Sequence, residues 1–451
     1  MPTLAHKIRL DPTPDQIRSF KQAAGTARFV WNWALSEWNR QYDAGQKPQA
    51  SALKKQFNAL KYERFPWLRD VHRDAHAQPF ADLADAWHRF FTGQNERPAF
   101  KKKGKAADGF YVANDKFQIA GRRVKLPKIG WVRLRESLRF PGKILGARVL
   151  READQWFFAV QVSVPDRVYY RTRTGHGVEG VDVGVKTFAT VSTGEKIAGP
   201  HAHRRALRRL KMRQRAITRK MQAAKGQMGL APQDPLSKGT RLPRSRNWIK
   251  AQTHIARTHL RVANLRRDFL HQTSTRLCRE NQAIGIETLS VRGMMANHRL
   301  ARSIADQGLG QFFALLKYKA DRYGTQLVEA DRWFPSSKLC STPGCGYVNK
   351  DLTLKDRVWS CPSCGVTQDR DLNAAMNLKG LATRTALPVA TASATKTTVS
   401  SKDGTDGKVT PVRYEARPAG LRLAASGQEE VEAHECAPTL SQARTGCGIN
   451  L

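Results

Sequence analysis

Two closely spaced pairs of cysteines place the strongest local constraint on how this chain can fold. Cys340 and Cys345 are followed, after fifteen intervening residues, by Cys361 and Cys364. Glycines and prolines beside both pairs allow tight turns, so the four thiolates can reach the corners of a tetrahedron. This spacing is typical of a structural zinc ribbon, in which sulfur occupies all four coordination positions. With only seven cysteines, clustered in this way, a disulfide scaffold is excluded.

The net charge indicates the class of partner. The 451 residues include 77 Lys and Arg against 38 Asp and Glu, which gives a net charge of +39. A chain this basic repels itself unless a polyanion neutralises it, and nucleic acid is the usual polyanion. A charge this large disfavours a merely basic soluble protein. A membrane-surface protein is less favoured still, because no basic amphipathic helix dominates the sequence. Hydrophobic residues make up 40% of the chain, which excludes a wholly disordered protein.

The last part of the chain carries little of this charge or of the apolar pattern. Residues 381–451 hold eight basic and seven acidic residues, and their first part is rich in Ala, Thr, Ser and Gly. We expect this tail to be largely disordered and outside the working part of the protein. The first residues lack an apolar signal core, and no run of 18 apolar residues occurs. We therefore expect no secretion, no transmembrane helix and no membrane partner.

The apolar pattern changes along the first 172 residues. It predicts a short strand at 5–10, then helices at 14–43, 52–62 and 78–91, the last with Pro79 in its first turn. The five tryptophans of the first hundred residues are expected to pack in a core rather than stack on bases. Between 110 and 164, short alternating runs separated by Gly and Pro predict a small antiparallel sheet or barrel.

Two basic regions are candidates for nucleic-acid contact. In one, five of the nine residues from Arg97 to Lys105 are basic, and Pro98 and Gly104 favour an ordered loop over a helix. In the other, residues 201–250 contain fifteen basic residues and one acidic residue, which exceeds what solubility requires. The candidate contacts are Lys101, Lys102, Lys103, Lys105, Arg204, Arg205, Arg208, Arg209, Lys211, Arg213 and Arg215.

Three acidic residues have contexts that suggest catalysis. Asp182 and Glu287 each end a short apolar strand, and Asp371 lies where a loop enters a helix. Each alone is more often a turn or cap residue. Carboxylates gathered in one cleft repel one another, and a divalent cation with a preference for hard oxygen ligands, Mg²⁺ or Mn²⁺, offsets that repulsion. Three carboxylates holding two such ions are suited to in-line phosphodiester hydrolysis.

These motifs together resemble the TnpB family, which bacterial insertion sequences encode and which is similar to the ancestors of type V CRISPR nucleases. The resemblance rests on Val-Asp-Val-Gly-Val-Lys around Asp182, Ile-Gly-Ile-Glu ending at Glu287, Phe-Pro-Ser-Ser-Lys-Leu-Cys-Ser from Phe334, the cysteine ribbon, and Asp-Arg-Asp-Leu-Asn-Ala-Ala-Met-Asn from Asp369. It covers roughly residues 1–380. The first cysteine pair is wider than the family pattern, with four intervening residues rather than two.

The resemblance implies an α+β multidomain fold, with a small N-terminal β-barrel carrying a helical insert and then an RNase H-like, RuvC-type α/β nuclease domain with an inserted zinc ribbon. It makes Asp182, Glu287 and Asp371 the catalytic acids, with Asp369 and Asn373 in support and Asp369 as the rival third acid. The implied domains are the barrel (1–18 and 107–172), the helical insert (19–106), the nuclease domain (173–337 and 366–380), the zinc ribbon (338–365) and the tail (381–451).

The resemblance also implies an RNA-guided DNA endonuclease that binds a structured guide RNA and cuts target double-stranded DNA beside a short adjacent motif. No small-molecule substrate is expected. The expected location is the bacterial cytoplasm, with nucleoid association when bound to DNA. Three alternatives remain open: an RNA-guided DNA-binding regulator that does not cut, a transposase acting in strand transfer, and a structural nucleic-acid-binding protein with a zinc ribbon. The presence of all three acids argues against a regulator that does not cut. A structural nucleic-acid-binding protein would leave the three acids unexplained.

Overall fold

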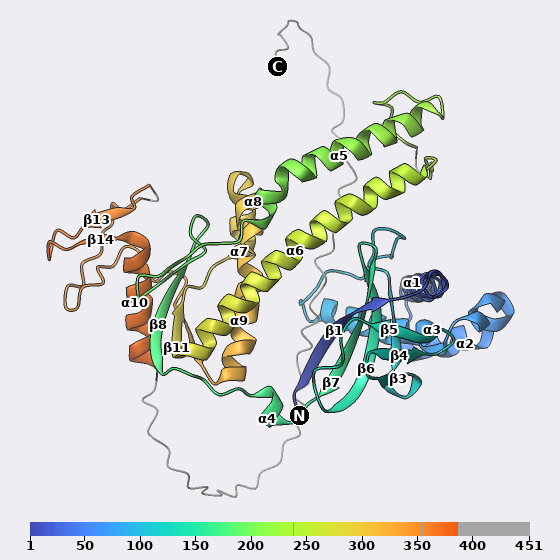
Figure 1. The fold of residues 1–451 in the computed structure, drawn as a ribbon, viewed down its shortest axis with the longest axis horizontal. Coiled ribbons are helices and arrows are strands. Elements are labelled where there is room, and N and C mark those ends of the chain that lie inside the picture. The colour runs from blue at the N-terminus through green and yellow to red at the C-terminus, as the bar shows by residue number, and fades with distance from the viewer. Residues whose placement is uncertain (238, 354, 387–451) are drawn as a thin grey trace, which may run out of the picture.

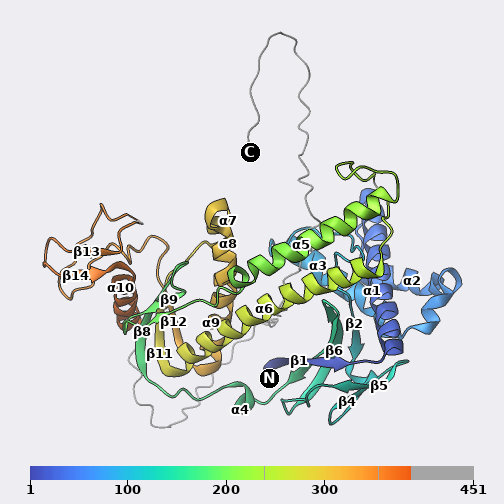
Figure 2. The ribbon, with the colours of Figure 1, turned by 45° about the horizontal axis from the view of Figure 1, so that its top comes forward.

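The computed structural model describes residues 1–237, 239–353 and 355–386, and the expectation for the rest of the tail lies outside these residues. An N-terminal part and a C-terminal part lie side by side, and a long helical hairpin of the C-terminal part extends toward the N-terminal part (Figures 1 and 2). No helix within the described ranges combines the length and the hydropathy that a membrane span requires.

The N-terminal part is built on one antiparallel sheet with the strand order β2-β6-β7-β1-β5-β4-β3. No pairing between described residues joins the edge strands β2 and β3, so hydrogen bonds do not close the barrel that the resemblance implied. The strands are β1 (Thr3–Asp11), β2 (Gly109–Ala113), β3 (Gln118–Ala120), β4 (Arg123–Leu126), β5 (Gly130–Leu134), β6 (Lys143–Glu152) and β7 (Gln155–Ser163).

Three helices and a short 3₁₀ helix are inserted between β1 and β2. They are α1 (Pro14–Asp43), α2 (Ala50–Arg64), η1 (Pro66–Asp70) and α3 (Arg73–Phe91). Aromatic rings fill the core between them, and the Trp38 and Trp87 rings stack with their centroids 5.2 Å apart. Trp31 is also buried, which confirms the core interpretation for these three tryptophans, whereas Trp67 is exposed.

Helix α3 begins earlier than the sequence pattern predicted. It starts at Arg73, so the expectation that Pro79 lies in the first turn is wrong and the proline is inside the helix. Contacts with β2 explain the additional turns, because the His72 ring lies 3.0 Å from the Tyr111 carbonyl oxygen and Asp74 accepts a hydrogen bond from the Ala113 amide. Tertiary contacts here outweigh the local signal of the proline.

The C-terminal part contains a five-stranded mixed sheet with the order β10-β9-β8-β11-β12. Strands β8, β11 and β12 run parallel, while β9 and β10 are antiparallel to their neighbours. Strands β8 and β9 pair as an antiparallel hairpin. The strands are β8 (Gly177–Val183), β9 (Ala189–Val191), β10 (Lys196–Ile197), β11 (Asn281–Ile286) and β12 (Gln326–Glu329).

Helices cover both faces of this sheet. Helices α6 and α9 lie on one side and α10 on the other (Figure 1). Helix α5 carries most of the basic residues of the region 201–250, and it forms an antiparallel hairpin with α6 (Figures 1 and 2). The buried Asp306 carboxylate accepts hydrogen bonds from the His203 and Arg204 amides at the first turn of α5. The helices are α4 (Asp166–Tyr169), α5 (Ala202–Gly226), α6 (Arg246–Glu280), α7 (Val291–Met295), α8 (His298–Gln307), α9 (Leu309–Tyr323) and α10 (Arg370–Thr385).

Two glycines allow α10 to lie directly on the sheet. A Cβ atom at Gly180 on β8 would overlap the backbone oxygen of Ala375, and one at Gly285 on β11 would overlap that of Leu378. Only a residue without a side chain permits this approach. Helix α10 ends at Thr385, so it extends five residues past the expected domain boundary at 380.

The close contact at Gly180 leads to a prediction. In Gly180→Ala the added methyl group meets helix backbone that cannot rotate away, so we expect a loss of about 1–3 kcal/mol in the free energy of unfolding. Gly226 is the matched control, since nothing lies within 4 Å of a Cβ placed there. Denaturant unfolding should show a large loss for Gly180→Ala and little change for Gly226→Ala. Equal stability of the two variants would contradict the proposed packing.

Candidate active site and cysteine site

The two strand-end acids point toward the start of α10. Side chains two residues apart on a strand share a face of the sheet, so Asp182 lies on the same face as Gly180, and Glu287 continues the face of Gly285. Helix α10 covers this face. The helix begins at Arg370, so Asp371 is in its first turn, beyond the glycine contacts and beside the strand ends.

The electrostatics of Asp182 show that the three acids lie within range of one another. Burial raises the pKa of Asp182 well above its ordinary value, and the charges of Glu287 and Asp371 raise it further. A cluster of carboxylates disfavours the charged form in this way. The structure therefore brings together side chains that are 105 and 84 residues apart in the sequence.

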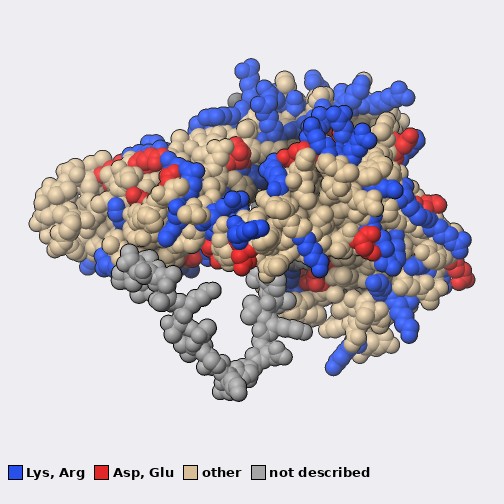
Figure 3. All heavy atoms as spheres, turned by 60° about the horizontal axis from the view of Figure 1, so that its bottom comes forward, with Lys and Arg blue, Asp and Glu red and all other residues tan. Residues whose placement is uncertain are grey.

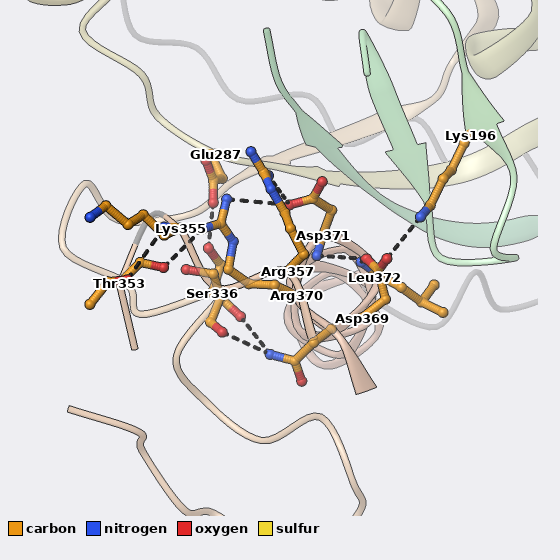
Figure 4. Close-up of polar contacts among 12 residues, drawn as sticks. Lys196, Glu287, Ser336, Thr353, Lys355, Arg357, Asp369, Arg370, Asp371 and Leu372 are labelled. Carbon is orange, nitrogen blue, oxygen red and sulfur yellow. Dashed lines mark hydrogen bonds and ion pairs between the residues drawn. The ribbon is translucent and has the colours of Figure 1, made fainter. Parts of the chain in front are cut away.

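Glu287 is held by a residue that the sequence reasoning did not single out. The buried Ser336 donates its hydroxyl hydrogen bond to Glu287 Oε1 (Figure 4). The Ser336 backbone oxygen in turn accepts from the side-chain amides of Asn373 and Asn377, and the Asn377 bond is 2.8 Å long. Ser336 is in the Phe-Pro-Ser-Ser motif, and Asn377 ends the Asp-Arg-Asp-Leu-Asn-Ala-Ala-Met-Asn motif, so the motifs themselves were the available signal.

Asp369 and Asp371 have different environments, although one residue separates them. Asp369 caps α10, since its Oδ1 accepts from the Asp371 and Leu372 amides at 3.0 Å. Its other oxygen pairs with Lys196 Nζ at 2.8 Å, so Asp369 is directed toward β10 (Figure 4). Burial alone opposes its charge, but the hydrogen bonds from Lys196 and the helix amides lower the pKa of Asp369.

Asp371 faces the other acids and two arginines. Arg370 Nη2 lies 3.4 Å from Asp371 Oδ1, and Arg357 Nη1 lies 3.7 Å from the same oxygen (Figure 4). Arg357 belongs to the segment between the two cysteine pairs, so that segment contributes a positive charge to the acidic cluster. These environments favour Asp371 over Asp369 as the third member of the cluster.

The donor set is suited to hard divalent cations. Carboxylate oxygens are the ligands that Mg²⁺ and Mn²⁺ prefer. Among the described residues, only the four cysteines form a group whose ligand atoms are close enough to share one ion. The three acids are spaced more widely than that. A site for two ions about 3.5–4 Å apart spreads its ligands more widely, which is compatible with carboxylates on three separate elements.

The four cysteines meet as the sequence predicted. Their sulfur atoms all lie within 4.8 Å of one another. Cys340 Sγ is 3.7 Å from Cys364 Sγ, and Cys345 Sγ is 3.6 Å from Cys361 Sγ. A tetrahedral zinc ion with Zn–S bonds of about 2.3 Å has sulfur–sulfur edges of roughly 3.8 Å, so the group fits zinc. The Val366 amide and the Thr342 hydroxyl lower the pKa of Cys364 to about 6, whereas burial raises the pKa of Cys361 to about 11, so Cys364 is the more readily ionised of these two thiols.

The cysteine module is attached to α10 beside the acids. Its hairpin consists of β13 (Val358–Ser360) and β14 (Thr367–Asp369), and the module lies at one end of the molecule (Figure 1). Asn373 links it to the helix, because its Oδ1 accepts from the Ser341 amide at 2.8 Å and its Nδ2 donates to the Leu339 carbonyl at 2.7 Å. Asn373 thus supports the site by fastening the segment that carries Ser336 and Cys340.

The N-terminal basic loop is ordered and docked on α1. Asn32 makes two hydrogen bonds with the backbone of Lys101, and Lys101 Nζ lies 3.5 Å from the centroid of the Trp31 ring. Lys102, Lys103 and Lys105 are exposed beyond this anchor. The expected ordered loop is therefore confirmed, and three of its four candidate lysines are accessible to a phosphate backbone.

Most basic candidates on α5 are exposed, and basic side chains gather along one edge of the molecule (Figure 3). Arg208, Lys211 and Arg215 line a shallow hollow on this helix. Arg213 differs from the expectation, because its guanidinium donates to the His254 carbonyl and the Thr258 hydroxyl of α6. The helical period turns Arg213 inward, so it joins the two helices instead of presenting its charge to solvent.

Family models match three parts of the chain. A model described as a helix-turn-helix domain matches residues 1–47, one described as a probable transposase matches 158–298, and the TNB domain of Cas12f1-like proteins matches 310–378. In the structure, residues 1–47 form a strand and a single helix of 30 residues, and not two helices joined by a turn.

Curated relatives match most of the chain. A protein of Streptomyces pristinaespiralis named "Putative RNA-guided DNA endonuclease" is 35% identical over 384 residues, which cover 83% of this chain and 88% of that protein. The chain belongs to the TnpB family. A family relative of the same description in Escherichia coli K12 is 29% identical, with coverage of 83% and 91%. The solved structure of CasPhi-2 (Cas12j) bound to crRNA is similar at 13% identity and a TM-score of 0.40, covering 85% of this chain and 98% of that one.

The raised pKa of Asp182 leads to a prediction for the zinc-loaded protein without Mg²⁺. Folding raises the pKa of Asp182, so the folded protein keeps the proton at pH values where the unfolded chain has released it. The free energy of unfolding therefore falls as the pH rises. Asp182→Asn removes that loss, so its thermal unfolding midpoint should exceed the wild-type value increasingly between about pH 5 and pH 8. Asp43→Asn, at an exposed carboxylate, is the control and should leave the midpoint nearly unchanged. An asparagine variant less stable than wild type at pH 8 would contradict the clustering.

Proposed function

We propose that this chain is an RNA-guided DNA endonuclease of a transposable element, which hydrolyses phosphodiester bonds with a RuvC-like site. The observation that carries the proposal is the meeting of Asp182, Glu287 and Asp371 on one face of the mixed sheet. The strand order, with three antiparallel strands followed by two parallel ones, supports the RNase H-like assignment. The names of the relatives support the guide and the DNA target.

The proposed site would hold Mg²⁺ or Mn²⁺ through the three carboxylates. When bound, two such ions activate a water molecule and stabilise the leaving oxygen of an in-line displacement. The residues of this chain prepare the ligands. Ser336 orients Glu287, and the Asp369 cap sets the direction of α10 so that Asp371 faces the strand ends. Asp369 and Asn373 are positioning residues in this proposal.

The zinc ribbon would be structural, with one Zn²⁺ held by Cys340, Cys345, Cys361 and Cys364. Its four positions are all filled by sulfur, so it leaves no open position for substrate. Its role is to hold the segment that carries Ser336 and Arg357 beside the acids.

The guide RNA and the target DNA would occupy the basic surfaces. The exposed lysines of the 101–105 loop and the outer face of α5 are separate regions, which suits two different nucleic acids. In such a complex, base pairing reads the target, while the protein reads a short adjacent motif and the shape of the heteroduplex. The cleaving function is favoured over a regulator that does not cut, because the three acids are present and lie together.

The experiment begins with expression of the protein together with its flanking element DNA. We expect one abundant RNA that ends near the element boundary to copurify, and the RNA-loaded protein to cut only matching plasmids in the presence of Mg²⁺. Asp182→Ala should reduce the rate on the order of 10³-fold or more, since metal ions contribute several kcal/mol to such reactions. Asp351→Ala, at an exposed carboxylate of the ribbon, is the control and should cut normally.

Three results would count against the proposal. A smear of cellular RNA would indicate binding of polyanions in general. Joined transposon ends formed without guide RNA would indicate a strand-transfer enzyme. Guided cleavage that persists in Asp182→Ala would exclude the assigned site.

A further inference from the structure

Trp333 is exposed to an unusual degree for its residue type. Its exposed fraction is 80%, whereas the tryptophans of the N-terminal core are nearly all buried. Single exposed apolar residues are common and need no explanation by themselves. The position of Trp333 relative to the acids distinguishes it from the other exposed aromatic residues.

The loop that carries Trp333 is anchored at both ends beside Glu287. At its start, the Ala330 amide donates to the Ile286 carbonyl at 2.8 Å, and the Thr288 hydroxyl donates to the Ala330 carbonyl at 2.6 Å. At its end, Ser336 donates to Glu287 itself. The loop between these anchors has five residues, and Trp333 is at its middle. Three residues span at most about 11 Å, so the backbone of Trp333 stays within that distance of Ser336.

The backbone at Trp333 is also held in place. Asp331 accepts hydrogen bonds from the Trp333 amide at 2.8 Å, through its side chain, and from the Phe334 amide at 3.0 Å, through its carbonyl. The turn therefore fixes the point from which the ring projects. A tryptophan side chain has only two rotatable torsions, so holding it against a ligand costs little conformational entropy.

Positive charge lies beside the ring and at the acid cluster. The Arg332 guanidinium is 5.2 Å from the centroid of the Trp333 ring, and the half-exposed Arg357 contacts the acid cluster. An exposed aromatic ring with flanking cations is the usual platform for single-stranded nucleic acid, because the ring stacks on a base while the cations meet the phosphates. The face of a base is free for such stacking only when the strand is unpaired.

We propose that Trp333 stacks on an unpaired base of the DNA strand that is being cut, and so holds that strand at the carboxylates. The inference rests on the proposed function, since it takes the strand at this site to be the substrate. Because every base has a stacking face, the contact selects single-stranded character and not sequence. Because the loop is anchored at Glu287, a base stacked on this ring would have its neighbouring phosphates within reach of the carboxylates.

The test uses full-length protein loaded with its guide RNA, and target DNA carrying 2-aminopurine at single positions of the cut strand. Ca²⁺ replaces Mg²⁺ so that the strand stays intact. Wild type and Trp333→Phe should quench 2-aminopurine at one position near the cut, and Trp333→Ala should leave it bright. With Mg²⁺ and subsaturating DNA, Trp333→Ala should cut about 5- to 150-fold more slowly, a range that follows from the usual strength of base stacking, and Trp333→Phe should recover most of the rate.

Trp131→Ala is the matched control, because Trp131 is also an exposed tryptophan and lies on β5 of the N-terminal sheet. Trp131→Ala should change neither the quenching of 2-aminopurine nor the rate of cleavage. Zinc content and the unfolding midpoint should be the same in all variants, since neither ring is buried. The stacking proposal is wrong if wild type cuts its target and Trp333→Ala matches wild type both in quenching 2-aminopurine and in cutting DNA. The proposed function would stand in that case.

Two other outcomes also decide the question. Quenching of 2-aminopurine in the guide RNA by Trp333, and not in the DNA, would overturn the assignment of the occupant. A wild-type protein that fails to cut any guide-matched DNA would overturn the proposed function and this inference together.

Discussion

The contact between α10 and the two glycines of the central sheet is the constraint on which the rest of the site depends. Gly180 and Gly285 have no side chains, so the helix backbone rests on the strands themselves. Two residues further along each strand, Asp182 and Glu287 emerge on the same face. The first turn of the helix then presents Asp371 to both. Three segments far apart in the sequence contribute one acid each, and one helix packing interaction brings them together.

Holding these acids together is costly, and the surrounding residues limit that cost. Burial and the neighbouring carboxylates raise the pKa of Asp182, while Arg357 and Arg370 lie beside Asp371. The cysteine module supplies one of these arginines and is fastened to α10 through Asn373. The module and the acid cluster are therefore parts of one arrangement, because the segment between β12 and α10 serves both. Acidic sites of this kind sacrifice stability for the binding of cations.

Much of the fold and of the candidate site could be predicted from the sequence. The cysteine group followed from the spacing of its residues, and helix α1 followed from the apolar period. Other features depend on tertiary contacts that no local pattern reports. The anchoring of α3 by β2 placed Pro79 inside the helix, and the rotation of α5 turned Arg213 toward α6. Ser336 gained its role only because the fold brings it to Glu287.

The most direct test of the central claim is a titration of the zinc-loaded protein with Mn²⁺, followed by electron paramagnetic resonance. Asp371 lies in the acid cluster, whereas Asp369 caps the helix. We therefore expect wild type to bind Mn²⁺ at a saturable site, Asp371→Asn to lose this binding, and Asp369→Asn to keep it, because asparagine also caps helices. Unchanged binding in Asp371→Asn, or its loss in Asp369→Asn alone, would contradict the account.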